Sequence, residues 1–261
     1  MRGGPLAGRR ILVTRPREQA AGLAALIRRE GGEPIIVPAI EIKDLADPQP
    51  FFELADRLDG FDLAIFISPN AVHKALGLLQ LRRQGKSWPA RLRVAALGAG
   101  SRRVLEQSGF HEVLAPASHA DSEALLALPA LADVAGQNVV IFRGEGGREL
   151  LGDTLAARGA QVEYAACYRR ARPDPGSGAA PAAWAQGAVD AVTVSSGEGL
   201  VNLYEMLAPP ERQWLTNRPL FVPHARVAEE AARLGACEIV VAGTGDEEIV
   251  ARLVAYFQDA K

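Results

Sequence analysis

Cysteine is scarce in this sequence, and its scarcity argues against two kinds of protein. The 261 residues contain two cysteines, Cys167 and Cys237, which form neither a disulfide framework nor a metal-binding motif. The four histidines are dispersed as well, so no metal-ligand spacing and no Ser-His-Asp arrangement is visible. We therefore expect no bound metal and a reducing compartment.

Long apolar runs and a charge excess are also missing. The first ten residues, MRGGPLAGRR, lack the apolar core of a signal peptide, and no segment approaches the roughly 20 apolar residues of a membrane span. A net charge of −2 gives no electrostatic basis for binding nucleic acid. We expect a soluble cytoplasmic protein with no membrane or nucleic-acid partner.

Lysine is the rare basic residue, with 4 lysines against 25 arginines. The planar guanidinium group suits the recognition of carboxylates and phosphates. A biased genomic composition explains the same ratio equally well, so the ratio alone leaves both interpretations open.

The clearest pattern that is present lies between Asn138 and Arg170. It combines an apolar strand (139–142), a Gly-rich turn, an amphipathic helix that begins near Leu150, and a second strand entered through Gly159. This order predicts a βαβ unit. With 48% hydrophobic residues, the whole chain has enough apolar material for the cores of two domains.

An earlier stretch that begins at Ile11 repeats this unit. Arg15 follows the strand of the earlier copy as Arg143 follows that of the later copy. Gly31 and Gly159 each end a helix. The members of each pair are 128 positions apart (143 − 15 and 159 − 31). Three further matches have slightly shorter offsets: Ser68 with Ser195, Gly109 with Gly235, and Asp121 with Asp246. The repeat predicts two similar α/β halves.

Strands and helices are expected to alternate along the chain. The predicted strands are 11–14, 34–40, 62–67, 93–97, 112–115, 139–142, 190–194, 219–222 and 238–242. Helices are expected at 16–30, 70–83, 198–207, 225–234 and 246–257, and after Gly98, Asp121 and Leu150. Such alternation predicts doubly wound parallel sheets, which bind ligands beyond the carboxyl ends of their strands.

Two segments look like connections between domains. Residues 41–50 are acidic and contain proline, and the stretch from Ala171 to Gly187 is rich in proline and glycine. The four repeated units can pair as two contiguous domains or with the middle two nested inside the outer two. We favour nesting, with 1–39 and 172–261 as one domain, 45–166 as the inserted domain, and linkers at 40–44 and 167–171 that lie side by side.

Six segments, in this order and spacing, resemble the uroporphyrinogen-III synthase family: ILVTRP, FISPNAV, ALGAGSRRVLEQSGF, RGEGGRELLGDTLAARGAQVEYAACYRR, TVSSGEGL and ARVAEEAARLGACEIVVAG. The resemblance runs from about Ile11 to Phe257 and is densest in 143–170. It implies an α/β fold of two similar doubly wound parallel-sheet domains, one inserted in the other, joined by a two-stranded linker.

The resemblance also implies an activity. The family cyclises the linear tetrapyrrole hydroxymethylbilane, inverts its last pyrrole ring and releases water, without a cofactor or metal. The substrate carries several carboxylates. We accordingly expect hydroxymethylbilane as the small-molecule ligand, a transient hand-over of it from hydroxymethylbilane synthase, and a monomer.

Helix starts supply most of the candidate substrate-binding positions, because their free backbone N–H groups bind anions. The same residues serve as ordinary helix caps, and the two roles are compatible. The candidates at helix starts are Ser68, Asn70, Ala71, Gly98, Gly100, Ser101, Ser195, Ser196, Gly197 and His224. His224 departs from the family, which has a small residue near that point.

Neither Gly-rich turn matches a nucleotide-binding motif. The turn at Gly98 has Arg103 at the sixth position of the dinucleotide pattern, and the turn at Gly144 lacks the Gly-Lys-Ser/Thr end of a P-loop. The second turn could still let the backbone approach a ligand. Further candidate substrate-binding residues are Arg15, Arg143, Gly144, Gly146, Gly147 and Arg148, with a structural ion pair as the alternative role of Arg15 and Arg143.

Tyr168 is the candidate catalytic residue. It lies at the expected crossing between domains and matches a tyrosine that the family is suggested to use. A phenol carries its proton at neutral pH and can donate it to a departing hydroxide. The alternative is an aromatic residue packed for its area.

Two other functions remain to be distinguished from this enzyme. A non-enzymatic two-domain protein could close on a small anionic ligand, and a nucleotide-using α/β enzyme would share the alternation of strands and helices. The absent export signal argues against the first, and the two failed glycine motifs argue against the second.

Overall fold

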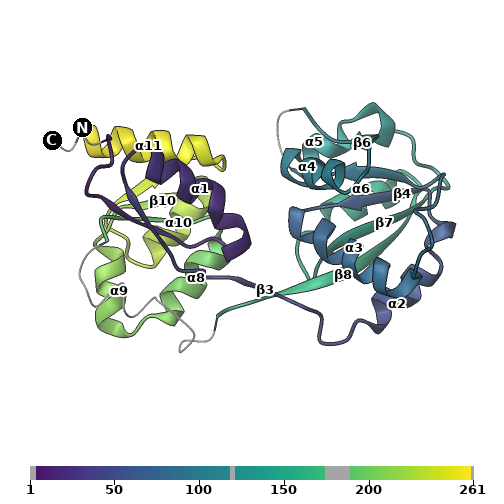
Figure 1. The fold of residues 1–261 in the computed structure, drawn as a ribbon, viewed down its shortest axis with the longest axis horizontal. Coiled ribbons are helices and arrows are strands. Elements are labelled where there is room, and N and C mark those ends of the chain that lie inside the picture. The colour runs from purple at the N-terminus through teal and green to yellow at the C-terminus, as the bar shows by residue number, and fades with distance from the viewer. Residues whose placement is uncertain (1–3, 118–120, 174–188, 260–261) are drawn as a thin grey trace. The chain divides into compact units, whose positions relative to one another are not determined.

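The computed structural model describes residues 4–117, 121–173 and 189–259 (Figure 1). The chain folds into two compact units, one made of Met1–Glu41 with Ala171–Lys261 and the other of Ile42–Arg170. Most of the predicted Pro- and Gly-rich connection lies outside the described residues. Within the described ranges, no helix is long and apolar enough to cross a membrane.

The first unit is a five-stranded sheet in the order β11-β10-β9-β1-β2, and its strand pairs are all parallel. Its elements are β1 Arg10–Val13, α1 Arg17–Arg29, β2 Glu33–Ile36, β9 Ala191–Thr193, α8 Gly197–Met206, α9 Pro209–Thr216, β10 Leu220–Val222, α10 Ala225–Arg233, β11 Ile239–Val241 and α11 Asp246–Asp259.

Helices cover both faces of this sheet, because successive side chains of a strand point to opposite faces. Leu12 joins a cluster with apolar residues of α8 and α10, such as Leu200 and Val227. Its neighbours Ile11 and Val13 join the opposite cluster, with residues of α1 and α11. The interior strand β1 is therefore buried on both sides, as parallel sheets require.

The second unit is a six-stranded sheet in the order β3-β8-β7-β4-β5-β6. Its elements are β3 Glu41–Lys43 at the junction of the two units, α2 Gln49–Asp56, β4 Leu63–Phe66, α3 Pro69–Arg83, β5 Arg93–Ala96, α4 Ala99–Gln107, β6 Val113–Leu114, α5 Ser122–Leu126, β7 Asn138–Gly144, α6 Leu150–Ala157 and β8 Gln161–Ala171, with short 3₁₀ turns at Leu58–Gly60 and Pro129–Leu131.

Two clusters again lie on opposite faces of the sheet. One contains residues of α2, α3 and α4 with Phe66 and Phe142, whose rings stack at 4.8 Å between centroids. The other contains residues of α5 and α6 with Leu63 and Ile141. The predicted α/β class with parallel sheets is thereby confirmed.

The internal repeat is visible in the strand order of the two sheets. β2-β1-β9-β10-β11 of the first unit correspond one by one to β8-β7-β4-β5-β6 of the second. Gly31 and Gly159, predicted to be equivalent, both follow a helix with φ of 88°. That backbone region is open to glycine and strained for other residues, which explains why both copies have glycine there.

Three local expectations were wrong or incomplete. Residues 41–50 contain β3 and the start of α2, so they are more than a crossing segment, and α9 was missed altogether. Both helices have proline in their first turn, where it is favourable, and within 41–50 the proline had suggested a connecting segment instead. The strand expected over 34–40 ends at Ile36, although the Val37 and Ala39 amides still donate to the Val13 and Thr14 carbonyls, at 3.0 and 2.9 Å.

The two sheets contain the strands that the nested arrangement assigns to each: β1 pairs with β9, and β4 pairs with β7. The proposed domain ranges, 1–39 with 172–261 and 45–166, imply in addition that the inserted part folds by itself. We expect residues 42–170, produced alone, to unfold in one cooperative thermal transition, because this unit contains both clusters of its own core.

Circular dichroism during heating measures this transition. The matched control is residues 1–41 alone, which lack the β9 partner of β1 and should show no transition. A non-cooperative melt of 42–170 would contradict the proposed domain.

Candidate functional site

The candidate site begins where the carboxyl ends of β4 and β5 meet the starts of α3 and α4. Ser68 is the N-cap of α3, and its Oγ accepts a hydrogen bond from the Ala71 amide at 3.1 Å. Gly98 is the N-cap of α4 and has no side chain to occupy the first-turn donors. Because β4 and β5 are adjacent parallel strands, the two helix starts lie side by side.

Backbone donors at these two starts remain for a ligand. Asn70 lies in the first turn of α3 together with Ala71, whose amide is already bonded to Ser68 Oγ, and Gly100 and Ser101 lie in the first turn of α4. A Cβ placed on Gly100 would lie 3.5 Å from the Pro69 ring, so the two first turns lie close together. Partial positive charge from both helices therefore gathers at one edge of the sheet.

The first unit repeats this arrangement at β9 and β10. Ser196 is the N-cap of α8, and its Oγ accepts from the Gly199 amide at 3.0 Å. His224 is the N-cap of α10 without a side-chain cap, and it corresponds to Gly98 with the offset of 126 seen elsewhere in the repeat (224 − 98). Ser195 and Gly197 flank the cap.

The cap positions correct one predicted match. Ser68 was aligned with Ser195, but the residue that caps the equivalent helix is Ser196. Strand pairing gives the same answer. Leu12 pairs with Val192, and its counterpart Val140 pairs with Ala64. Both pairs of equivalent residues are 128 positions apart (140 − 12 and 192 − 64), which is also the distance from Ser68 to Ser196.

Tyr168, in β8, lies against the start of α3. Its hydroxyl is 3.2 Å from Ser68 Oγ, and the geometry permits either group to be the donor. The side chain is only 4% exposed. Its ring covers Gly144 so closely that a Cβ there would lie 2.8 Å from the ring. The structure thus brings Tyr168, Ser68 and Gly144 together within one unit.

A β-bulge sets the direction of Tyr168. Arg143 pairs with Ala166 and Gly144 with Tyr168, so one residue of β8, Cys167, has no counterpart on β7. Strict alternation would place Tyr168 on the same face as Tyr164, toward α6. The extra residue instead puts it on the face of Ala165 and Cys167, toward α3.

Cys167 is held at this bulge as a thiol. Its Sγ donates to the Arg143 carbonyl at 3.2 Å, and burial raises the pKa of the Cys167 thiol to about 12. A thiol with this pKa is not a nucleophile at neutral pH. Across the described residues, no group of three or more His, Cys, Asp or Glu side chains could hold a metal ion.

The turn after β7 contains the remaining predicted residues of the second unit. Arg143 is 6% exposed, and its guanidinium group donates to the Gly146 carbonyl and stacks on the Tyr164 ring, 4.6 Å from the centroid. Gly146 and Gly147 have φ of 67° and 109°. Arg148 forms an exposed ion pair with Glu123 at 3.0 Å.

Arg15, the counterpart of Arg143, is bound differently. It forms an ion pair with Asp246 at the start of α11 and donates to the Thr244 carbonyl at 3.2 Å. This contact is the ion pair with a neighbouring helix that was the alternative to substrate binding. Substrate contact by Arg15 stays a prediction.

Sequence reasoning missed two contributors to this site. Tyr164 provides the surface for the Arg143 guanidinium group, and the Glu145 amide donates to the Tyr168 carbonyl at 2.9 Å. For Tyr164 the sequence offered one signal, its position four residues before Tyr168 in the same strand. No signal existed for the second, because a backbone contact leaves no trace in residue type.

Comparison with known families places the chain. The family model described as uroporphyrinogen-III synthase HemD matches residues 21–249. Uroporphyrinogen-III synthase of Salmonella typhimurium is 35% identical over 246 residues, which cover 93% of this chain and 98% of that protein. The Escherichia coli protein of the same name matches with the same identity and coverage.

Solved structures agree on the fold. A mutant uroporphyrinogen III synthase from the extremely thermophilic bacterium Thermus thermophilus superposes with a TM-score of 0.63 at 19% identity and covers 97% of this chain and 100% of that one. The synthetase from Helicobacter pylori gives 0.60 at 12% identity, with 95% and 99% covered. With the family model and the curated relatives, these matches lead to one conclusion: the chain belongs to the uroporphyrinogen-III synthase family.

Proposed function

We propose that this protein is a uroporphyrinogen-III synthase, a cyclising lyase of tetrapyrrole biosynthesis. It converts hydroxymethylbilane to uroporphyrinogen III, with inversion of the last pyrrole ring and loss of water. The observation that carries the proposal is the 35% identity to the Salmonella typhimurium enzyme over 93% of this chain and 98% of that protein. We further propose that it works as a cytoplasmic monomer and receives the substrate from hydroxymethylbilane synthase.

The helix starts supply what a polycarboxylate ligand needs. Each unit presents two neighbouring helix N-termini at the carboxyl edge of its sheet: α3 and α4 in one, α8 and α10 in the other. Backbone N–H groups there bind carboxylates without a charged side chain. The residues proposed to contribute are Ser68, Asn70, Ala71, Gly98, Gly100, Ser101, Ser195, Ser196, Gly197 and His224.

Tyr168 is proposed to donate a proton to the leaving hydroxyl group. Departure of that group as water leaves an electrophilic carbon, which the substituted carbon of the last ring attacks. Ser68 Oγ, 3.2 Å away, orients the phenol in the resting state. The positive end of α3 at Ser68 would also stabilise the phenolate that remains after proton donation.

A product-resolved turnover assay tests the function directly. Purified protein is supplied with hydroxymethylbilane, and the type III and type I macrocycles are separated after oxidation. The type I isomer forms without an enzyme, so type III above the no-enzyme background supports the proposal. Type I alone would count against it and favour the anion-binding alternative.

Two substitutions at Tyr168 separate proton donation from packing. Tyr168→Phe keeps the ring over Gly144 and removes the hydroxyl that contacts Ser68, so its melting temperature should fall only slightly. Its turnover should fall at the low end of the roughly 10²–10⁴-fold range for general acids, or less, because water can substitute in part.

Tyr168→Ala is the packing control. The ring is almost fully buried, so its removal should cost about 3 kcal/mol of stability. Thermal melts and initial rates of both variants are the measurements. A fully active Phe variant beside a destabilised Ala variant would show that Tyr168 only packs.

The two serine caps should matter modestly for affinity. Ser196→Ala removes the acceptor of the Gly199 amide but leaves the backbone donors of α8, so product binding should weaken by about 1 kcal/mol. Ser68→Ala should lose slightly more, because Ser68 also contacts Tyr168. Calorimetric titration with the product measures both, and abolished binding in either variant would oppose the backbone-donor model.

A further inference from the structure

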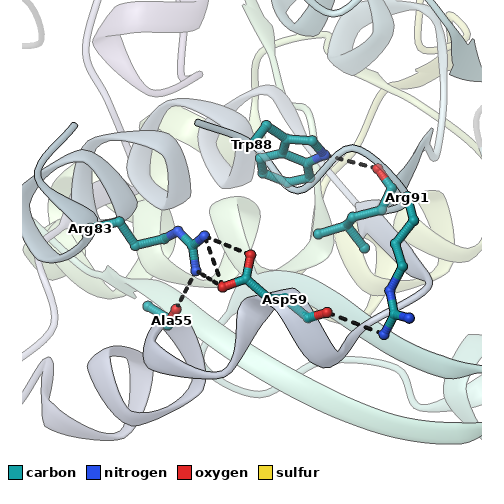
Figure 2. Close-up of polar contacts among 6 residues, drawn as sticks. Ala55, Asp59, Arg83, Trp88 and Arg91 are labelled. Atoms are coloured by element: carbon teal, nitrogen blue, oxygen red, sulfur yellow. Dashed lines mark hydrogen bonds and ion pairs between the residues drawn. The ribbon is translucent and has the colours of Figure 1, made fainter. Parts of the chain in front are cut away.

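Two arginines of the second unit are buried, and their partners differ. Arg83, 9% exposed, donates to both carboxylate oxygens of Asp59 and to the Ala55 carbonyl (Figure 2). Arg143, 6% exposed, forms no ion pair among the described residues, and its Nε is buried without a hydrogen-bond partner. A cation buried without a carboxylate is costly, so its contacts need an explanation.

The contacts of Arg143 converge on the turn that follows it. The guanidinium group donates to the Gly146 carbonyl, and a Cβ on Gly147 would lie 2.7 Å from its Nη2. The Tyr164 ring supports one face of the guanidinium group, which offsets part of the desolvation. The turn is therefore built around this side chain.

Tyr164 anchors the same group to α6. Its hydroxyl donates to the Glu149 carbonyl at 3.1 Å, and a Cβ on Gly152 would lie 2.1 Å from that hydroxyl. The ring that supports Arg143 is thus itself held at the helix start. Arg143 is clamped between a fixed ring and the glycine turn.

The other side of this turn holds Tyr168. Gly144 lies under the phenol ring, and the Glu145 amide donates to the Tyr168 carbonyl at 2.9 Å. Residues 144–147 therefore join the guanidinium group of Arg143 to both the ring and the backbone of Tyr168. A shift of the turn would move the phenol away from Ser68.

We propose that Arg143 is a positioning residue for Tyr168, which it holds through the turn 144–147, and that it does not bind substrate. The proposal rests on the proposed function only in its expected effect on turnover. The Nε of Arg143 is inaccessible, one face of its guanidinium group lies on Tyr164, and its Nη2 is bound to the Gly146 carbonyl. Little of the cation is left for a substrate carboxylate.

Arg143→Met is the test, with Arg83→Met as the matched buried control. Methionine is apolar and of similar length, and Gly146 is an exposed residue whose carbonyl can bond water once the guanidinium group is gone, so the variant should fold. Turnover of Arg143→Met should fall about as far as that of Tyr168→Phe. Arg83→Met should lower the melting temperature and leave kcat unchanged.

A double mutant gives the decisive kinetic comparison. If Arg143 acts through the phenol, Arg143→Met combined with Tyr168→Phe should be no slower than the slower single variant. Multiplied losses, a fully active Arg143→Met, or a fully active Tyr168→Phe would overturn the proposal. KM should stay near that of the wild type, whereas a residue that binds substrate would raise it.

Amide hydrogen exchange gives a reading without substrate. The Glu145 amide, bonded to the Tyr168 carbonyl, should exchange about tenfold faster in Arg143→Met and stay protected in Arg83→Met. Unchanged exchange would overturn the proposal. If wild-type protein forms no type III product, the proposed function fails, and this measurement still decides whether Arg143 holds the turn.

Discussion

The β-bulge between β7 and β8 is the constraint on which the candidate site depends. One unmatched residue, Cys167, reverses the face on which Tyr168 lies and brings its hydroxyl to 3.2 Å from Ser68 Oγ. The same irregularity places the phenol ring on Gly144, where a larger residue would not fit. Without the bulge, Tyr168 would face α6, and the start of α3 would have no phenol beside it.

The anion binding that we propose for the site would come from topology more than from side chains. Parallel strands followed by helices put several helix N-termini at one edge of a sheet. Because the chain contains the repeat, each of the two sheets has such an edge. The cap residues can therefore vary, as Gly98 and His224 do at equivalent positions. A ligand with many carboxylates suits such a surface because backbone donors are insensitive to residue type.

The two copies of the repeat have diverged at their arginines. Arg15 is paired with Asp246, whereas the equivalent acid in the second unit, Asp121, caps its own helix by accepting from the Ala124 amide at 2.7 Å. Arg143 is left with a carbonyl and an aromatic ring. The equivalent arginines thus form a structural ion pair in one unit and, as we propose, hold Tyr168 in position in the other.

The sequence by itself determined the α/β class, the repeat, most strand and helix positions, and the helix starts, because these depend on local periodicity and on turn residues. It missed α2 and α9, which both begin with proline in the first turn. Only the tertiary structure decided where Tyr168 points and which of two equivalent arginines has a carboxylate partner. Both depend on strand register and on contacts between residues far apart in the chain, and a single unpaired residue in a strand changes no local pattern.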